Sequence, residues 1–414
     1  MDWRRVWRSC LGLVFCAQAA LAGAASGESN WVGSWTTSVQ VPEARNALAL
    51  SDLSDATLRQ VVHLSIGGEI LRVHLSNAFG TAALHFTSVH IARPTPASSA
   101  QIDTSTDREL TFSGRPAVAI PAGAEYVSDP VAFGARAQSN LVITFHLDAP
   151  PVGETSHPGS RTTSYLVHGD HVADAELPGA TTFDHWFIIG GVDVSAPPGA
   201  AAIVALGDSI TDGRGSTTNG NDRWTDDLAH RLLQAMPARS LSVLNAGIGG
   251  NRLLADGLGP NALARFDRDV LAQPGVRYLI VLEGVNDIGT FGLEAGQSQP
   301  AHEALVRRIV GAYEQMVLRA HAHGIRVFGG TLTPFGGSAY YKQGPWSEAD
   351  REAVNGWIRA PGHFDAVIDF DKALRDLEHP EQLGQAYDSG DHLHPSPAGY
   401  LAMAAAVPLE DFAP

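Results

Sequence analysis

A serine and a histidine in this sequence have surroundings that suit nucleophilic catalysis. Ser209 follows residues 201–206, an apolar run with the length of a buried strand. A serine at the turn where a strand ends exposes its hydroxyl and leaves its backbone amide free. His394 lies three residues after Asp391. A carboxylate at that spacing can accept the Nδ1–H of the imidazole, which leaves Nε2 free to act as a base toward a serine.

Two other loops carry groups that suit the stabilisation of negative charge. Gly250 lies in a glycine-rich loop after the apolar residues 241–244, and glycine lets backbone N–H groups approach a ligand closely. Asn286 follows the apolar residues 278–282, and its side-chain amide can donate to an oxyanion. Each motif also has an ordinary structural explanation: a helix cap at Ser209, a tight turn at Gly250 or an Asx turn at Asn286. The catalytic interpretation therefore depends on all of them occurring together.

The segments that carry these residues alternate between strands and helices. Apolar runs of strand length occur at residues 201–206, 241–244, 278–282, 325–328 and 367–370. Helical periodicity occurs at residues 224–235 and 302–323. This order predicts a doubly wound α/β domain with a parallel sheet over residues 201–414. Active sites in such domains form at the carboxyl ends of the strands, where the four motifs lie.

The preceding part of the chain predicts strands alone. Strand patterns occur at residues 61–66, 71–75 and 141–145. Gly67 and Gly68 separate the first two strands and predict a hairpin turn between them. Recurrent Pro and Gly turn signals, without long helical periodicity, indicate an all-β sandwich or jelly-roll domain over residues 23–194. Residues 195–200 contain Pro-Pro-Gly and predict a linker between the two domains.

The first residues predict export from the cell. Three arginines precede residues 11–21, an apolar stretch that is too short to span a membrane. Residues 20–22 read Ala-Leu-Ala, a cleavage signal, so residues 1–22 are expected to be the signal peptide of a secreted or periplasmic protein. Both cysteines, Cys10 and Cys16, lie in this leader, so no disulfide or catalytic thiol is expected in the mature chain.

The charge of the chain argues against two classes of partner. The 414 residues include 28 Lys and Arg against 44 Asp and Glu, for a formal net charge of −16. An acidic surface repels the phosphates of nucleic acids and the headgroups of anionic lipids. We therefore expect no nucleic-acid partner, and no membrane-spanning segment remains once the signal peptide is removed.

The motifs together resemble the sequence blocks of the SGNH/GDSL hydrolase superfamily. Residues 207–209 read Gly-Asp-Ser, as in its first block, and Gly250 matches the glycine of the second. Asn286 matches the asparagine of the third block, and residues 391–394 match the Asp-x-x-His of the fifth. One departure is Ile210, where the family's Gly-Asp-Ser-Leu has leucine. The resemblance covers the whole of the predicted α/β domain.

The resemblance implies ester hydrolysis through an acyl-enzyme. Ser209 would attack the ester carbonyl, His394 would accept the serine proton and later return it to the leaving alcohol, and Asp391 would orient His394. The oxyanion would be held by the backbone N–H groups of Ser209 and Gly250 and by the Asn286 side chain. This chemistry requires neither a metal nor an organic cofactor.

Two other hydrolase classes fit the sequence less well. An ordinary α/β-hydrolase requires Gly-x-Ser-x-Gly, which surrounds no serine of the α/β domain. A zinc hydrolase could use His392 and His394 as ligands, but no carboxylate cluster of suitable spacing accompanies them. His392 is therefore expected to be a loop or rim residue.

A β-domain followed by an SGNH domain also resembles exported bacterial carbohydrate esterases, including acetyl xylan esterase-like proteins. The leading hypothesis is removal of O-acyl groups, most simply O-acetyl, from a carbohydrate, with the β-domain forming a wall of the cleft or binding glycan. A lipase, arylesterase or thioesterase acting on lipophilic acyl groups is the alternative, and a catalytically silent glycan-binding protein is a third hypothesis. Candidate substrate contacts in segments expected to border the cleft are Arg252, Phe335, Tyr340, Tyr341 and Trp346.

Overall fold

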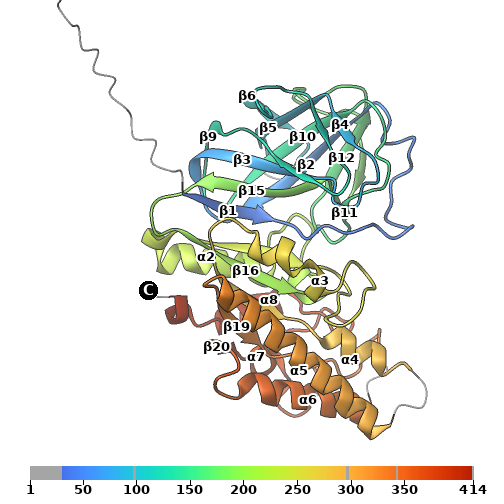
Figure 1. Ribbon diagram of the computed structural model, residues 1–414, viewed down its shortest axis with the longest axis vertical. Helices are drawn as coiled ribbons and strands as arrows, with labels where there is room; N and C mark the ends of the chain where they lie inside the picture. The colour runs from blue at the N-terminus through green and yellow to red at the C-terminus, as the bar shows by residue number, and fades with distance from the viewer. Residues whose placement is uncertain (1–29, 97–98, 295–297, 342–343, 413–414) are drawn as a thin grey trace, which may run out of the picture.

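The computed structural model describes residues 30–412, apart from residues 97–98, 295–297 and 342–343 (Figure 1). The predicted signal peptide, residues 1–22, lies outside the described residues and stays a prediction. Within the described part of the chain, no helix is both long enough and apolar enough to cross a membrane. The chain forms a β half followed by an α/β half, which lie one above the other in Figure 1.

The β half consists mainly of two antiparallel sheets. One sheet contains β1 (Trp31–Thr36), β15 (Ile189–Ser195), β3 (Gly68–Ser76), β8 (Glu125–Val127) and β9 (Val131–Ala135). The other contains, in spatial order, β13 (Thr181–Phe183), β12 (Ser164–His168), β2 (Ala56–Leu64), β10 (Ser139–Leu147), β5 (Ser88–Pro94) and β6 (Ile102–Glu109). Alternate residues of both sheets, such as Leu71 and Val73 of β3 and Leu141 and Ile143 of β10, are buried in one apolar cluster. The predicted β-sandwich is therefore confirmed.

The predicted hairpin at Gly67 and Gly68 is wrong. Strand β2 pairs with β10 and β12, whereas β3 pairs with β15, β8 and β9, so the two glycines carry the chain from one sheet to the other. A Cβ atom on Gly67 would lie 2.5 Å from the carbonyl oxygen of Ala135. The glycines are needed because other backbone segments pack closely against this crossing, and not because a two-residue hairpin turn demands them.

The α/β half has a parallel five-stranded sheet, as predicted. Its spatial order is β17 (Leu241–Gly247), β16 (Ala201–Gly207), β18 (Val276–Leu282), β19 (Arg326–Gly330) and β20 (Ala366–Ile368). All seven residues of β16 are buried, which explains the continuous apolar run at this position. The chain passes from β16 outward to β17 and then back across β16 to β18. The carboxyl ends of β16 and β18 therefore flank the point where the strand order reverses, which is the usual place for a binding crevice.

Helices form two groups around this sheet. In one group, α8 (Pro397–Ala406) packs on α2 (Trp224–Ala235) and α7 (Phe370–Leu374). In the other group, α5 (Gln299–Ala322) packs on α3 (Ala262–Phe266) and α6 (Pro345–Arg359). Right-handed crossovers place these groups on opposite faces of the sheet, as in a doubly wound fold. Two shorter helices, α1 (Ser209–Asp212) and α4 (Val285–Phe291), begin directly after β16 and β18.

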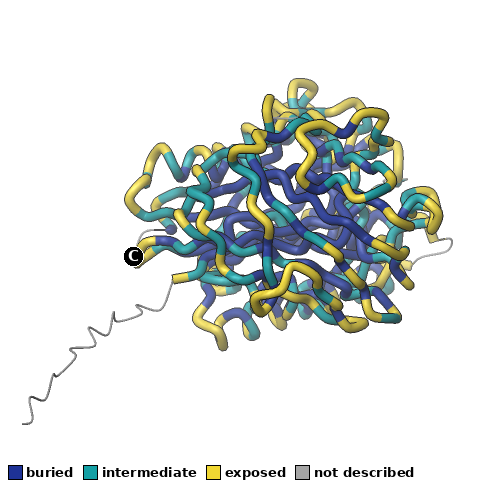
Figure 2. Tube along the Cα trace, turned by 90° about the horizontal axis from the view of Figure 1, so that it is seen from above, coloured by how far each residue is buried: buried dark blue, intermediate teal, exposed yellow. Residues whose placement is uncertain are grey.

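The two halves share a continuous interior. Strand β1 packs against β17, and one cluster of buried apolar side chains extends through both halves. Figure 2 shows that the buried residues lie in the interior and the exposed ones around the rim. Hydrogen bonds also cross the junction: the amide of Val243 donates to the side-chain oxygen Ser65 Oγ at 2.8 Å. The amide of Gly33 donates to the carbonyl of Pro274 at 2.9 Å. The β half is thus fixed against the α/β half and can supply a rigid wall to a site between them.

Candidate active site

Ser209, His394 and Asp391 form a continuous hydrogen-bonded chain. Ser209 is the first residue of α1, and the side chain of Asp208 caps this helix by accepting from the amide of Ile210 at 2.9 Å. Ser209 Oγ lies 2.8 Å from His394 Nε2, and His394 Nδ1 lies 2.7 Å from Asp391 Oδ2. Ser209 and His394 are only 6% and 3% exposed, so the nucleophile and base would react in a largely water-poor environment.

The surroundings of Asp391 keep its carboxylate ionised. Burial alone would raise the pKa of Asp391, but hydrogen bonds from the His394 side chain and from the amides of His394 and Leu393 hold that pKa well below its usual range. An ionised carboxylate only accepts, so the hydrogen of the imidazole is placed on Nδ1. Nε2 then presents its lone pair to the hydroxyl of Ser209, which is the tautomer that a general base requires.

Gly250 and Asn286 lie beside Ser209 in the same cavity. Gly250 has a φ of 73°, in the left-handed region that favours glycine. Among the described residues, no acceptor bonds to the Gly250 amide. Asn286 Nδ2 donates one hydrogen to the carbonyl of Asn251 at 2.8 Å, and its second N–H remains for an oxyanion. The geometry therefore suits the predicted oxyanion-binding groups.

Tyr341 orients the amide of Asn286. Its hydroxyl donates to Asn286 Oδ1 at 2.6 Å, which keeps Nδ2 turned away from Tyr341. Burial is the main cause that raises the pKa of Tyr341 to about 12, so the hydroxyl remains a donor throughout the neutral range. Tyr341 was predicted as a substrate contact; it lines the cavity, and this hydrogen bond also makes it a positioning residue for Asn286.

Replacing Tyr341 by phenylalanine is expected to lower kcat about tenfold, because a loosely held amide donates less well to the oxyanion. Initial rates on 4-nitrophenyl acetate measure the effect. Tyr387→Phe is the matched control, since no hydrogen bond of the Tyr387 hydroxyl occurs among the described residues. If Tyr341 acts through Asn286, the same change in an Asn286→Ala background has little further effect. A full tenfold loss in that background would contradict the assigned role.

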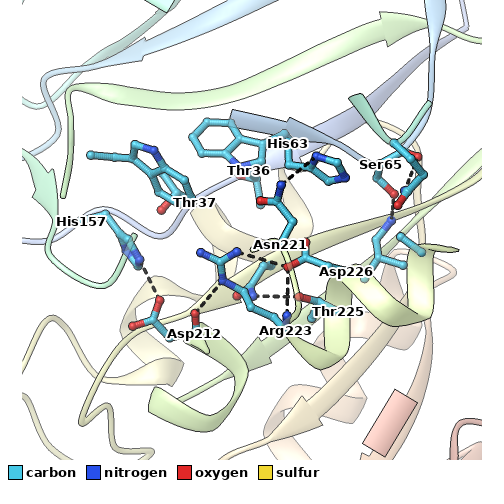
Figure 3. A pocket seen from close by; sticks show the side chains of 16 residues that line it. Thr36, Thr37, His63, Ser65, His157, Asp212, Asn221, Arg223, Thr225 and Asp226 are labelled. Atoms are coloured by element: carbon cyan, nitrogen blue, oxygen red, sulfur yellow. Dashed lines mark hydrogen bonds and ion pairs between the residues drawn. The ribbon is translucent and has the colours of Figure 1, made fainter. Parts of the chain in front are cut away.

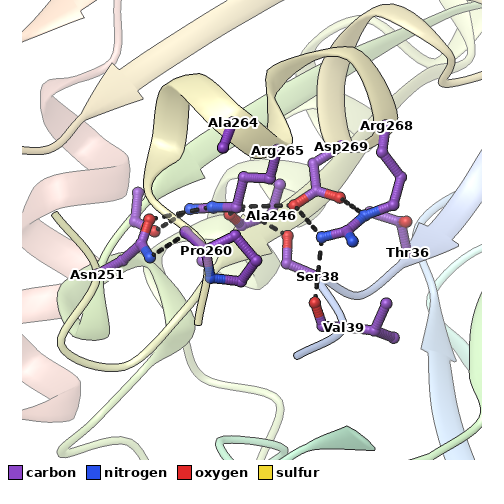
Figure 4. A network of polar contacts seen from close by, with 12 residues as sticks. Thr36, Ser38, Val39, Ala246, Asn251, Pro260, Ala264, Arg265, Arg268 and Asp269 are labelled. Atoms are coloured by element: carbon purple, nitrogen blue, oxygen red, sulfur yellow. Dashed lines mark hydrogen bonds and ion pairs between the residues drawn. The ribbon is translucent and has the colours of Figure 1, made fainter. Parts of the chain in front are cut away.

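Arg265 connects the loops that carry these groups (Figure 4), and no sequence motif identified it. The side chain is fully buried on α3. Its guanidinium donates to acceptors at three strand ends and one loop: Gly207 O, Ala246 O, Glu283 Oε1 and Asn251 Oδ1. Asp269 balances the charge at 3.0 Å. Arg265 thus fixes the relative positions of the segments that precede Ser209, Gly250 and Asn286.

The neighbouring carboxylate Asp287 fixes the loop after Gly250. Its two oxygens accept from the amides of Leu253 and Leu254 at 2.8 and 3.0 Å. Asp287 follows Asn286 directly on α4, so the same helical turn places the amide donor and anchors the glycine loop. The pair of adjacent residues therefore couples two parts of the predicted oxyanion site.

The β half reaches the nucleophile helix through His157 (Figure 3). His157 Nε2 lies 2.9 Å from Asp212 Oδ1, and Nδ1 lies 2.8 Å from the carbonyl oxygen of Ser38. A carbonyl and a carboxylate both accept, so the ring bonds to both when each nitrogen carries a hydrogen. Asp212 is the last residue of α1, and its carbonyl also accepts from Arg223 Nε at 3.0 Å. A buried contact between the halves therefore holds the short helix that begins with Ser209.

Further contacts from the β half reach the segment below the site. The hydroxyl of Ser38 accepts from Arg265, and the carbonyl of Val39 accepts from Arg268 at 3.1 Å (Figure 4). Residues 38–39 follow β1 and contact Arg265 of α3 and Arg268 of the helical segment Asp267–Leu271 that continues it. The sequence predicted a wall of the cleft in the β half but not that this half would hold the catalytic segments.

The cavity that contains Ser209 and His394 has a volume of about 490 Å³ and is lined from both halves. From the α/β half it is lined by Ser209, Asp212, Arg214, Gly249, Gly250, Leu258, Asn286, Tyr340, Tyr341, Leu393 and His394. From the β half it is lined by Gln40, Glu43, Arg45, Asn46, His157, Pro158, Gly159, Arg161, Asp184 and His185. A small polar substrate fits such a space better than an extended apolar chain does.

The five candidate substrate contacts divide into two groups. Tyr340 and Tyr341 line the cavity, and the ring of Tyr340 meets the imidazole of His394 edge-on with centroids 5.5 Å apart. The other three candidates, Phe335, Trp346 and Arg252, do not line this cavity. Phe335 is fully buried in the apolar core.

The other two side chains have structural partners instead. Trp346, near the start of α6, stacks on His302 of α5, with ring centroids 5.8 Å apart. Arg252 donates to the carbonyl of Asp256 within its own loop. His392, predicted to be a loop or rim residue, is more than half exposed, and its Nδ1 lies 2.6 Å from Asp388. These contacts explain why aromatic and charged residues near the motifs are not all substrate contacts.

Comparison with known proteins gives a family for the α/β half. The model of the GDSL-like lipase/acylhydrolase family matches residues 205–402. The fold is similar to a putative lipolytic protein of the G-D-S-L family from Desulfitobacterium hafniense, at 20% identity and a TM-score of 0.37 over 50% of this chain and 97% of that one. It is also similar to an acetylxylan esterase from Geobacillus stearothermophilus, at 21% identity and a TM-score of 0.37 over 50% and 91% of the two chains. No curated protein matches the sequence.

Proposed function

Because residues 205–402 form a domain of the GDSL-like lipase/acylhydrolase family, we propose that this ester hydrolase removes O-acyl groups, chiefly O-acetyl, from a carbohydrate. The observation that carries the proposal is the polar lining of the cavity of about 490 Å³ beside Ser209. Amide, carboxylate, guanidinium and imidazole groups make up much of this lining, and Pro158, Leu258, Leu393 and two tyrosines contribute its apolar surface. Sugar hydroxyls find hydrogen-bond partners on such a surface, and a long acyl chain finds little apolar area to bury.

The proposed reaction proceeds in two halves at the same residues. Ser209 Oγ bonds to the acyl carbon while its proton passes to His394 Nε2, and the carbonyl oxygen becomes an oxyanion. The N–H groups of Ser209, Gly250 and Asn286 stabilise that charge. When the tetrahedral intermediate collapses, the ester bond breaks, and the departing sugar oxygen takes the proton from His394. Water then attacks the acyl-enzyme, gives its proton to the same imidazole, and releases the free acid and the free serine.

The acyl and alcohol preferences of the purified enzyme test the proposal. On a series of 4-nitrophenyl esters, we expect kcat/KM to be highest for acetyl and to fall steeply toward octanoyl. On acetylated xylan, mannan, pectin, chitin oligomers and peptidoglycan, we expect rapid acetate release from at least one. A preference for octanoyl esters would support a lipase or thioesterase instead. Release of acetate from none of these glycans would contradict a carbohydrate substrate. Bound glycan without turnover would indicate a silent binding protein.

A further inference from the structure

The wall of the catalytic cavity contributed by the β half contains buried polar atoms without partners. Arg161 Nε and His185 Nδ1 are both buried, and neither has a hydrogen-bond partner among the described residues. Both side chains line the cavity that contains Ser209. Burying such groups without partners costs free energy, and they are rare in folded proteins unless a ligand or water completes them. This wall therefore carries polar side chains whose hydrogen-bonding capacity is not used up within the described residues.

The backbone around Arg161 is held in a strained conformation close to the nucleophile. Arg161 has a φ of 49°, in the left-handed region that non-glycine residues rarely adopt. Its carbonyl accepts from the amide of Asn219 at 2.9 Å, which ties this loop to the α/β half. Two residues earlier, a Cβ on Gly159 would lie 1.9 Å from Asp212 Oδ2, so the loop packs directly against α1. Strain of this kind persists where the surroundings fix a side chain for function.

A second arginine, Arg214, lines the same cavity from the α/β half. Arg214 follows α1, and its amide donates to the carbonyl of Ser209 at 2.9 Å, so its backbone is fixed relative to the nucleophile. The carbonyl of Arg214 accepts from Tyr400 at 2.6 Å. Its guanidinium carbon lies 5.8 Å from the ring centre of Tyr340, the ring that meets His394. Arg214 thus places a positive charge next to Tyr340, the residue that contacts the catalytic His394.

The carboxylates in the cavity do not neutralise these arginines by ion pairing. Glu43 accepts from Asn46 at 2.5 Å and from Gln40 at 3.2 Å. Asp184 accepts from the hydroxyl of Thr163 at 3.1 Å. The third carboxylate, that of Asp212, is bonded to His157. Within the described residues, neither Arg161 nor Arg214 forms an ion pair, and both side chains line the cavity, so neither positive charge is directly neutralised by a carboxylate there.

We propose that Arg161 and Arg214 select an ester whose carbohydrate part carries an anionic group, specifically a carboxylate such as that of a uronic acid. This inference rests on the proposed function and adds the charge of the substrate to it. A guanidinium presents a planar set of N–H donors that matches a carboxylate, and each charge-assisted contact strengthens where water is partly excluded. The two arginines hold the sugar carboxylate, while the acyl carbon faces Ser209.

A matched pair of substrates tests the proposal. Methyl glucoside and the methyl glycoside of glucuronic acid, each acetylated at the same ring hydroxyl, differ only at C6, where a hydroxymethyl group is replaced by a free carboxylate. Acetate release gives kcat/KM for each. We expect the wild-type enzyme to favour the glucuronate at least about tenfold, and Arg161→Gln and Arg214→Gln each to lower that ratio about tenfold. Arg108→Gln serves as the control, because Arg108 is exposed on β6 and does not line the cavity. It should keep the wild-type ratio.

Each other outcome counts against the inference in a distinct way. Equal kcat/KM for the two wild-type substrates overturns the anionic preference alone, and equal losses on both substrates in the arginine variants overturn the assignment of the two residues. Hydrolysis of 4-nitrophenyl acetate with no turnover of either sugar ester overturns the proposed function as well. If a variant does not fold, kcat/KM of the wild-type enzyme is measured at increasing salt concentration instead. Salt screens the charge attraction, so it should lower kcat/KM for the glucuronic acid substrate and leave that for the glucoside unchanged.

Discussion

Replacing Ser209 by alanine is expected to lower kcat for 4-nitrophenyl acetate by at least about 10⁴-fold. The change removes the oxygen that would bond to the acyl carbon, and the backbone amide of residue 209 remains in place for the oxyanion. His394 then has no hydroxyl to deprotonate, although it lies 2.8 Å from Ser209 Oγ in the native protein. The side chain is small, so the melting temperature should change little while the rate falls steeply.

Ser216 provides the matched control for this experiment. Its hydroxyl donates to the carbonyl of Gly213 at 2.6 Å in the loop that follows α1, outside the catalytic cavity. Ser216→Ala should therefore keep kcat within about threefold of the native value. Labelling with a phosphonate ester gives an independent readout, since the native enzyme should carry the adduct on Ser209 and Ser209→Ala should carry none. Undiminished ester turnover by Ser209→Ala would end the proposed mechanism.

The parts of the fold that the sequence predicts are those determined by local pattern. The apolar run at residues 201–206 lies within β16 because a strand buried on both faces needs apolar side chains on both faces. The motifs after β16 and β18 meet because the carboxyl ends of parallel strands lie at one edge of the sheet. Alternation in β2 and β3 identifies a buried face but not the sheet to which a strand belongs, so the predicted hairpin was wrong.

The supporting residues of the site lack a sequence signature for a physical reason. Arg265 donates to two backbone carbonyls and to side chains from several separate segments of the chain, so no local sequence pattern marks its partners. His157 and Asp212 come from different halves of the chain, and their contact depends on how the halves pack. Phe335 shows the converse problem: an aromatic side chain near a motif suits a cleft and an apolar core equally, and here the core buries it.

Replacing Asp391 by asparagine is expected to lower kcat by about 10³- to 10⁴-fold without moving any other group. Asp391 Oδ1 accepts from the amides of Leu393 and His394, and Oδ2 accepts from His394 Nδ1. In Asp391→Asn the amide oxygen keeps the two backbone donors, so its NH₂ faces Nδ1. The imidazole hydrogen must then move to Nε2, which turns a donor toward Ser209 and removes the base.

Asp388→Asn tests whether this effect depends on the tautomer of His394. Asp388 lies in the same loop and bonds to the exposed His392 at 2.6 Å, so the control should retain near-native kcat. Melting temperature against pH gives a second readout. The folded pKa of Asp391 lies below its unfolded value, so its ionised form stabilises the fold above an unfolded pKa of about 4, and this stabilisation disappears as the pH falls through the folded value. The native protein should therefore exceed Asp391→Asn in stability at neutral pH and lose that advantage in acid. A constant difference at every pH would show that Asp391 is not held as a carboxylate by His394.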